Sequence, residues 1–186
     1  FFIFISLMAI WLIERYLSRE RLPFFCGVPS LNVIISVILS STCYIGAVVT
    51  TNAANVVFIS ALIPLITATM SNVFIGERVR GGTWLAMLVA LGGVLVIVWD
   101  GIAAGTWLGD FLAFMAAFYT AATFTAIRGS GQNLTPALAL GSLGSSISAM
   151  VLFGATPAAL MVSGSYGLPA WAWLAINGLV AIPIAT

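Results

Sequence analysis

The sequence predicts an all-α membrane protein whose helices cross the bilayer several times. Of the 186 residues, 62% are hydrophobic and only 6% are charged, whereas soluble domains carry about 25% charged residues. Residues 22–76 contain no charged side chain, and one straight helix of that length would measure about 80 Å against a hydrocarbon core of about 30 Å. All six cationic residues are arginines in alternate connections between apolar runs. The chain is therefore expected to fold back on itself in lipid.

Seven apolar runs predict seven spans. Backbone surrounded by lipid must be hydrogen-bonded within a helix or a closed barrel, and these runs are longer and more continuously apolar than the alternating segments of barrel strands. In chain order, the predicted spans are residues 1–13, 29–50, 54–75, 82–99, 108–127, 136–153 and 170–186.

The connections between these spans alternate in charge. Those after the first, third and fifth spans contain all the arginines, namely Arg15, Arg19, Arg21, Arg78, Arg80 and Arg128. The connections around residues 51–55, 100–109 and 156–169 contain no Lys or Arg. Because cytoplasmic loops are enriched in Lys and Arg, the arginine-bearing connections are predicted to be cytoplasmic. The tryptophans agree, since all lie near predicted span ends, where the indole favours the headgroup region: Trp11, Trp84, Trp99, Trp107, Trp171 and Trp173.

The chain is expected to be part of a longer protein, incomplete at both ends. It begins with Phe1 rather than Met, and Thr186 lies inside an uncharged run. The first apolar run does not resemble a signal peptide, because its charges follow it and no small-residue cleavage site appears. We interpret it as a helix that is cut short.

The composition argues against an enzyme. Without histidine there is no Ser-His dyad, and no cluster of Cys and carboxylates has metal-ligand spacing, so neither a cofactor nor a metal is predicted. The acidic residues all lie at or beyond span ends, where a solvated interfacial carboxylate is the expected state: Glu14, Glu20, Glu77, Asp100 and Asp110.

The most specific pattern covers residues 55–97 and reads NVVFISALIPLITATMSNVFIGERVRGGTWLAMLVALGGVLVI. It joins a helix with a central Pro64, a Gly-Glu-Arg sequence at residues 76–78, and a second helix with Trp84 and two adjacent glycines. This spaced pattern closely resembles the EamA repeat of the drug/metabolite transporter superfamily. The family often has Gly where this chain has Ala86, a small residue that preserves close helix packing.

The resemblance implies a helical bundle of two inverted five-span repeats, of which this chain holds spans two to eight. Residues 1–99 would form most of the first repeat, with four spans, residues 100–107 an external connection, and residues 108–186 the start of the second repeat, with three spans. Such repeats are related by an axis in the membrane plane.

The resemblance also implies a function. It predicts a multi-pass transporter of small organic metabolites, such as amino acids or related compounds, that works by alternating access in the bacterial cytoplasmic (inner) membrane. Its partners would be the bilayer and the metabolite, with no nucleic acid, and a homodimer is left open. The alternative is a non-transporting membrane scaffold or accessory subunit. A lipid-handling enzyme is disfavoured by the shortage of titratable groups.

Polar residues inside the predicted spans are the candidate substrate site. Pro64 removes one backbone hydrogen bond and crowds the carbonyl of Ser60, so the third span should kink near the bilayer centre. The freed carbonyl and nearby hydroxyls would line the pathway, or the hydroxyls would simply satisfy the carbonyl. Other buried polar groups would contact substrate or join helices by hydrogen bonds. The candidate set is Ser40, Tyr44, Ser60, Pro64, Thr67, Tyr119, Thr123 and Asn177.

Glu77 is the most unusual of the acids. A carboxylate at the C-terminal end of a helix opposes the helix dipole, so its position requires a partner. Arg78, Arg80 or the N-terminus of the next helix would supply one. The sequence therefore predicts a clasp on the inner face made by Glu77, Arg78 and Arg80, with gating as an alternative role.

Overall fold

The computed structural model describes residues 2–17, 27–77, 79–98 and 106–154. Within these residues the fold is all-helical, which confirms the predicted fold class. The chain divides into two compact units: Phe1–Ile34 with Asn133–Thr186, and Ile35–Gln132. In the described part of the first unit, α1 (Phe2–Leu17) packs against α7 (Thr135–Phe153), with Leu7 and Trp11 buried.

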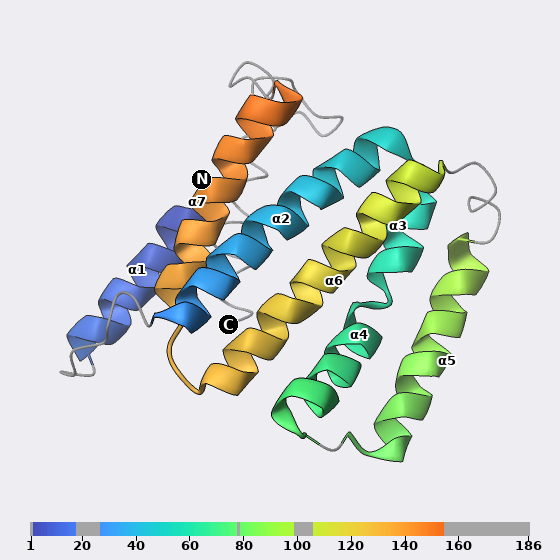
Figure 1. Cartoon of the computed structure of the whole chain (residues 1–186), viewed down its shortest axis with the longest axis horizontal. Helices are drawn as coiled ribbons and strands as arrows, with labels where there is room; N and C mark the ends of the chain where they lie inside the picture. Colours follow the sequence, from blue (N-terminus) through green and yellow to red (C-terminus); the bar gives the residue numbers. More distant parts are fainter. Residues whose placement is uncertain (1, 18–26, 78, 99–105, 155–186) are drawn as a thin grey trace. The chain divides into compact units, whose positions relative to one another are not determined.

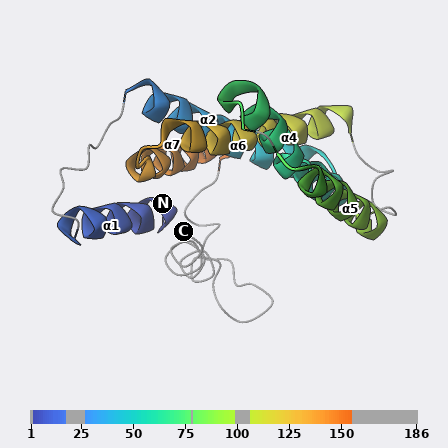
Figure 2. The ribbon, with the colours of Figure 1, turned by 90° about the horizontal axis from the view of Figure 1, so that it is seen from below.

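The second unit contains the features that bear on function. It holds α2 (Val28–Thr50) from Ile35 onward, α3 (Ala53–Ser60), α4 (Ile63–Met70), the π-helical turn η1 (Ser71–Ile75), α5 (Gly81–Val98) and α6 (Trp107–Ser130). In Figures 1 and 2, α6 lies along α3 and α4, and α5 lies beside α3. Hydrogen bonds from Ser40 tie α2 to α6.

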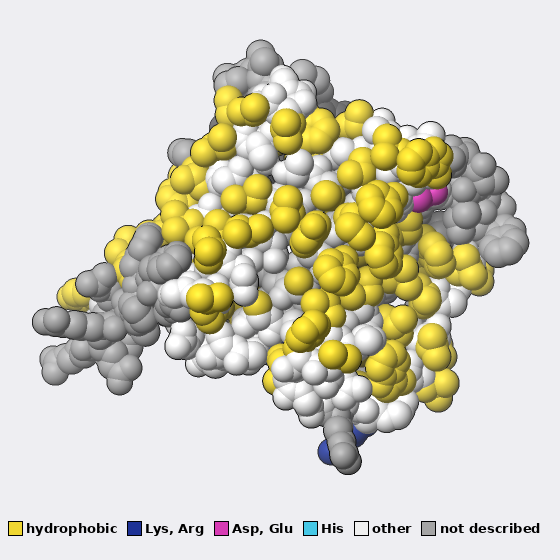
Figure 3. Space-filling view, viewed as in Figure 1, with side chains coloured by type: hydrophobic (Ala, Val, Ile, Leu, Met, Phe, Trp, Pro, Cys, Tyr) yellow, Lys and Arg dark blue, Asp and Glu magenta, His cyan; other side chains and the backbone are white. Residues whose placement is uncertain are grey.

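Helix length and composition agree with the predicted spans. Four described segments are long and apolar enough to cross a membrane: Val28–Thr50, Ala53–Ile75, Trp107–Ser130 and Thr135–Phe153. They correspond to the predicted second, third, fifth and sixth spans. Shorter apolar helices cover the first and fourth, and the seventh, residues 170–186, lies outside the described residues. In the second unit, apolar side chains cover the face seen in Figure 3, and the charged side chains visible there lie at its opposite ends.

At the predicted kink near Pro64, a turn at residues 61–62 separates α3 from α4. α3 ends at Ser60, the N–H of Ala61 donates to the carbonyls of both Val57 and Phe58 at 3.1 Å, and the N–H of Leu62 donates to the Ile59 carbonyl at 3.0 Å. Pro64 falls in the first turn of α4, where its missing N–H costs no helical bond. The third span therefore consists of two short helices joined at residues 61–62.

The core of the second unit is built from small side chains. Ala113, Ala117 and Ala121 on α6 are buried, and Ala113 packs with Ala47 of α2 and Val56 of α3. Small residues let helix backbones approach closely, which is how helices associate in lipid, where apolar burial gives little net gain. α6 is thus the helix around which the second unit packs.

Candidate functional site

Two cavities lie beside the break in the third span. The first, which we call the hydroxyl cavity, has a volume of about 420 Å³, and five hydroxyl-bearing side chains from α2, α3 and α6 contribute to its wall. Its lining is Ser40, Ser41, Tyr44, Ile45, Ser60, Ile63, Ala116, Ala117 and Thr120. None of the described residues that line this cavity is charged.

The hydroxyls of this cavity differ in their availability. Ser40 Oγ donates to the Ala116 carbonyl at 3.0 Å and lies 2.6 Å from Thr120 Oγ1, so it joins α2 to α6. Of the two roles left open for buried polar residues, contact with substrate or hydrogen bonding between helices, Ser40 has the second. Tyr44 is 46% exposed, and its phenol is therefore more accessible to a ligand than Ser40.

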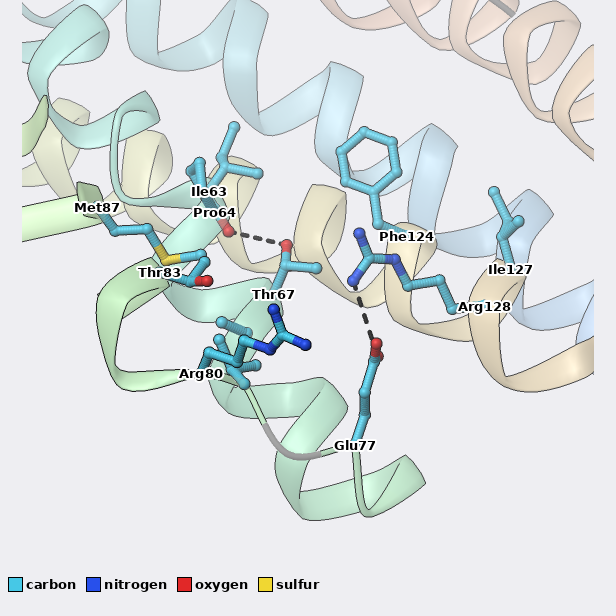
Figure 4. A pocket seen from close by; sticks show the side chains of 12 residues that line it. Ile63, Pro64, Thr67, Glu77, Arg80, Thr83, Met87, Phe124, Ile127 and Arg128 are labelled. Atoms are coloured by element: carbon cyan, nitrogen blue, oxygen red, sulfur yellow. Dashed lines mark hydrogen bonds and ion pairs between the residues drawn. The ribbon is translucent and has the colours of Figure 1, made fainter. Parts of the chain in front are cut away.

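The second cavity, which we call the arginine cavity, lies on the other side of the break. Its volume is about 680 Å³, and α4, α5, α6 and the α4–α5 connection form its walls. Its lining is Ile63, Pro64, Thr67, Ala68, Glu77, Val79, Arg80, Thr83, Met87, Phe124, Ile127 and Arg128. Figure 4 shows the guanidinium groups of Arg80 and Arg128 near the Thr67 side chain. Ile63 lines both cavities.

The structure divides the candidate site residues between these places. Ser40, Tyr44 and Ser60 line the hydroxyl cavity, whereas Pro64 and Thr67 line the arginine cavity together with Glu77 and Arg80. Thr67 Oγ1 donates to the Ile63 carbonyl of its own helix at 2.8 Å.

Four candidates fall outside both linings. Tyr119 packs edge-on against Phe118, and Thr123 Oγ1 donates to the Tyr119 carbonyl at 3.0 Å. Arg78 and Asn177 lie outside the described residues.

Glu77 has a partner that the sequence did not identify. Glu77 Oε2 lies 3.8 Å from Arg128 Nη1, and both side chains are more than half exposed. The preceding π turn ends at Gly76, whose φ of 74° suits a residue without a Cβ, and this reversal brings Glu77 back toward α6. The arginine pattern predicts that Arg128 and Glu77 lie on the same side of the membrane. This was the sign in the sequence that the two residues could form a pair. Exposed pairs of this kind contribute at most about 1 kcal/mol.

A second polar cluster lies where the end of α2 and the start of α3 meet the start of α6. We call it the outer junction, because the arginine pattern predicts that this end is external. Asp110 Oδ1 accepts hydrogen bonds from Thr51 Oγ1 (2.9 Å) and Asn55 Nδ2 (3.0 Å). Thr106 Oγ1 donates to the Thr50 carbonyl at 2.6 Å. Asp110 lies at the start of α6, as expected of an interfacial carboxylate, and it has in addition these two partners, which the sequence did not identify. Its place in the first turn of α6 also favours a negative charge.

Gly109 permits the close approach at the outer junction. A Cβ built there would meet Thr51 Cβ and would lie 2.8 Å from both Thr50 Oγ1 and the Thr51 backbone nitrogen. Only hydrogen fits at this position. This contact could not be predicted from the sequence, because it depends on how the helices cross.

Comparison with known proteins identifies the family. The family model described as "EamA-like transporter family" matches residues 1–99, which is more than half of the 186 residues. Searches of curated proteins and of solved structures gave no match. The resemblance seen in the Pro64 to Trp84 region is thus confirmed, and the chain belongs to the EamA-like transporter family of membrane proteins.

Proposed function

We propose that the protein transports small organic metabolites, with amino acids or related compounds as the leading candidates, by alternating access across a bacterial cytoplasmic membrane. The observation that carries this proposal concerns Ile63. This residue begins α4, directly after the break in the third span, and its side chain lines both cavities. A backbone change at residues 61–62 would move this side chain relative to both cavities. Both volumes fall in the range of about 300–1,000 Å³ typical of small-molecule sites.

The arrangement supports a solute pathway with two chemically different parts. The hydroxyl cavity has an uncharged wall, which favours zwitterionic or amphipathic solutes over inorganic ions, whose sites need oxygen cages or charge rings. The arginine cavity lies toward the end that the arginines predict to be cytoplasmic. In the complete protein, residues 1–99 and 108–186 would belong to two inverted repeats that alternate around the site.

Counterflow in liposomes tests this function directly. The complete protein, reconstituted and preloaded with an unlabelled metabolite, should accumulate the same labelled metabolite faster than protein-free liposomes, across a panel of amino acids and their derivatives. Uptake at the protein-free rate for the whole panel would favour the alternative, a membrane scaffold or accessory subunit.

Tyr44→Phe in the same assay should weaken transport about tenfold, the effect of one lost hydrogen bond of roughly 1.4 kcal/mol. The change removes the exposed phenol of the hydroxyl cavity while keeping the ring. Tyr119→Phe is the matched control and should transport normally, because Tyr119 lines neither cavity. A larger loss in Tyr119→Phe than in Tyr44→Phe, with both variants folded, would contradict this assignment of the pathway.

The proposed orientation predicts which sites react with an impermeant thiol reagent. In a background without Cys26 and Cys43, a Trp107→Cys variant should react in intact cells, because Trp107 is 82% exposed at the end of α6 predicted to be external. A Gln132→Cys variant should react only after the membrane is permeabilised, because it follows Arg128 on the predicted cytoplasmic side. The reverse pattern of labelling would invert the topology.

A further inference from the structure

The charges that line the arginine cavity do not balance. Among the described lining residues, Arg80 and Arg128 face a single acid, Glu77, which leaves one excess positive charge in this part of the chain. The only ion pair within the described residues is the one between Glu77 and Arg128. Arg80 has no acidic partner within 4 Å in this part of the chain, so its guanidinium donors face the open cavity (Figure 4).

The rest of the cavity wall is mostly apolar. In Figure 4, Ile63 and Met87 lie to the left and Phe124 to the upper right, with the Arg128 guanidinium below Phe124 and the Arg80 guanidinium lower in the view. A ligand that satisfies both regions needs an anionic group and an apolar or aromatic body. A guanidinium binds carboxylate and phosphate through charge-assisted hydrogen bonds. The apolar part of the wall offers a surface on which the apolar body of such a ligand can pack.

We propose that the arginine cavity binds an amphiphilic organic anion, with its carboxylate or phosphate on Arg80 and its apolar body against Met87 and Phe124. This inference rests on the proposed function, because the occupant would be the transported solute in its inward-facing position. It narrows the substrate class from small metabolites in general to those that carry a negatively charged group.

Glu77 acts in this proposal as a competing anion. Its carboxylate contacts Arg128 at 3.8 Å through a pair that is more than half exposed on both sides, which is a weak interaction. Glu77 can therefore leave Arg128 at little cost, which would free the Arg128 guanidinium to attract an anion held on Arg80. Removal of the Glu77 charge should tighten anion binding, whereas removal of the Arg80 charge should weaken it.

Matched pairs of small molecules test the proposal in the complete protein, purified into nanodiscs of phosphatidylcholine. The probes are phenylacetate, indole-3-acetate and decanoate, each compared with its neutral amide by isothermal titration. At least one carboxylate should bind about tenfold more tightly than its amide, the scale of one charge-assisted hydrogen bond. Equal affinity within all three pairs, or no binding by any carboxylate, would overturn the proposal.

Two variants show whether the named residues are responsible. Arg80→Gln should weaken carboxylate binding about tenfold and leave amide binding unchanged. Glu77→Gln should tighten carboxylate binding about two- to fivefold, a gain that a merely damaged fold would not produce. Unchanged carboxylate affinity in Arg80→Gln, or weaker binding in Glu77→Gln, would contradict the roles given to these residues.

An anionic phospholipid of the inner leaflet has the same chemistry, and two further measurements separate it from a solute. If the occupant is a lipid, phosphatidylglycerol in the nanodiscs should abolish carboxylate binding, and the solute assignment would be wrong. If it is a solute, binding should persist and the bound carboxylate should inhibit counterflow. If counterflow persists but no carboxylate binds, the anion-site proposal is wrong and the transport function stands. If carboxylates bind but no counterflow occurs, the anion site stands and the transport function is wrong.

Discussion

Gly109→Ala should strongly lower the melting temperature and the abundance of the complete protein. The added methyl would meet Thr51 Cβ, and it would lie 2.8 Å from the Thr51 backbone nitrogen. Thr51 is poorly able to move away, because its N–H donates to the Ala47 carbonyl at 2.8 Å and its hydroxyl donates to Asp110. Overpacking of this kind costs about 1–3 kcal/mol or more. Thermal unfolding of the purified protein in detergent measures the loss.

Gly92→Ala is the control for this prediction. Gly92 also lies inside an apolar helix, but a Cβ there would meet nothing within 4 Å. Alanine has a better helix propensity than glycine, so this change should be neutral or slightly stabilising. Equal destabilisation by the two substitutions would show that the helices do not meet closely at Gly109.

Asp110→Ala should also destabilise the protein, by about 1–3 kcal/mol, because it leaves a buried donor without its acceptor. The side chain of Asn55 is 4% exposed and donates to Asp110 Oδ1 at 3.0 Å, and Thr51 Oγ1 donates to the same atom. Asp110→Asn keeps an oxygen acceptor and should therefore lose less stability than Asp110→Ala. The measurement is again the melting temperature.

A double-mutant cycle makes the assignment specific. In an Asn55→Ala background the donor is already absent, so Asp110→Ala should cost clearly less than in the unmodified protein. If Asp110→Ala costs the same in both backgrounds, the Asn55–Asp110 hydrogen bond does not explain its effect.

The elements of this fold were predictable from sequence because the physics that sets them is local. Lipid requires each apolar run to be helical, and a proline within a run interrupts it. That is why the ends of α2 and the break at Pro64 follow from the printed sequence. The prediction differs from the structure in one respect: a kink within one helix was expected, whereas the structure has two helices, α3 and α4.

The contacts between helices could not be predicted in the same way. Whether a polar side chain lines a cavity depends on how its helix is rotated and where it crosses its neighbours, and neither is encoded locally. Tyr44 and Tyr119 look equivalent in sequence, yet only Tyr44 lines one of the two cavities. The Glu77–Arg128 pair and the hydrogen bonds of Asp110 likewise join residues more than fifty positions apart.

The threonines inside the second unit mostly bond to their own helices. Thr67, Thr123 and Thr125 each donate to the carbonyl four residues earlier. A hydroxyl bonded in this way keeps its partner when the helix moves as a rigid body, whereas a hydroxyl shared between two helices would have to give up its partner in a medium without water. A rearrangement of α4 against α6 would therefore carry these hydrogen bonds along unbroken, and the resistance to sliding would come from the packing of buried side chains such as Ala68 on α4 and Ala121 on α6.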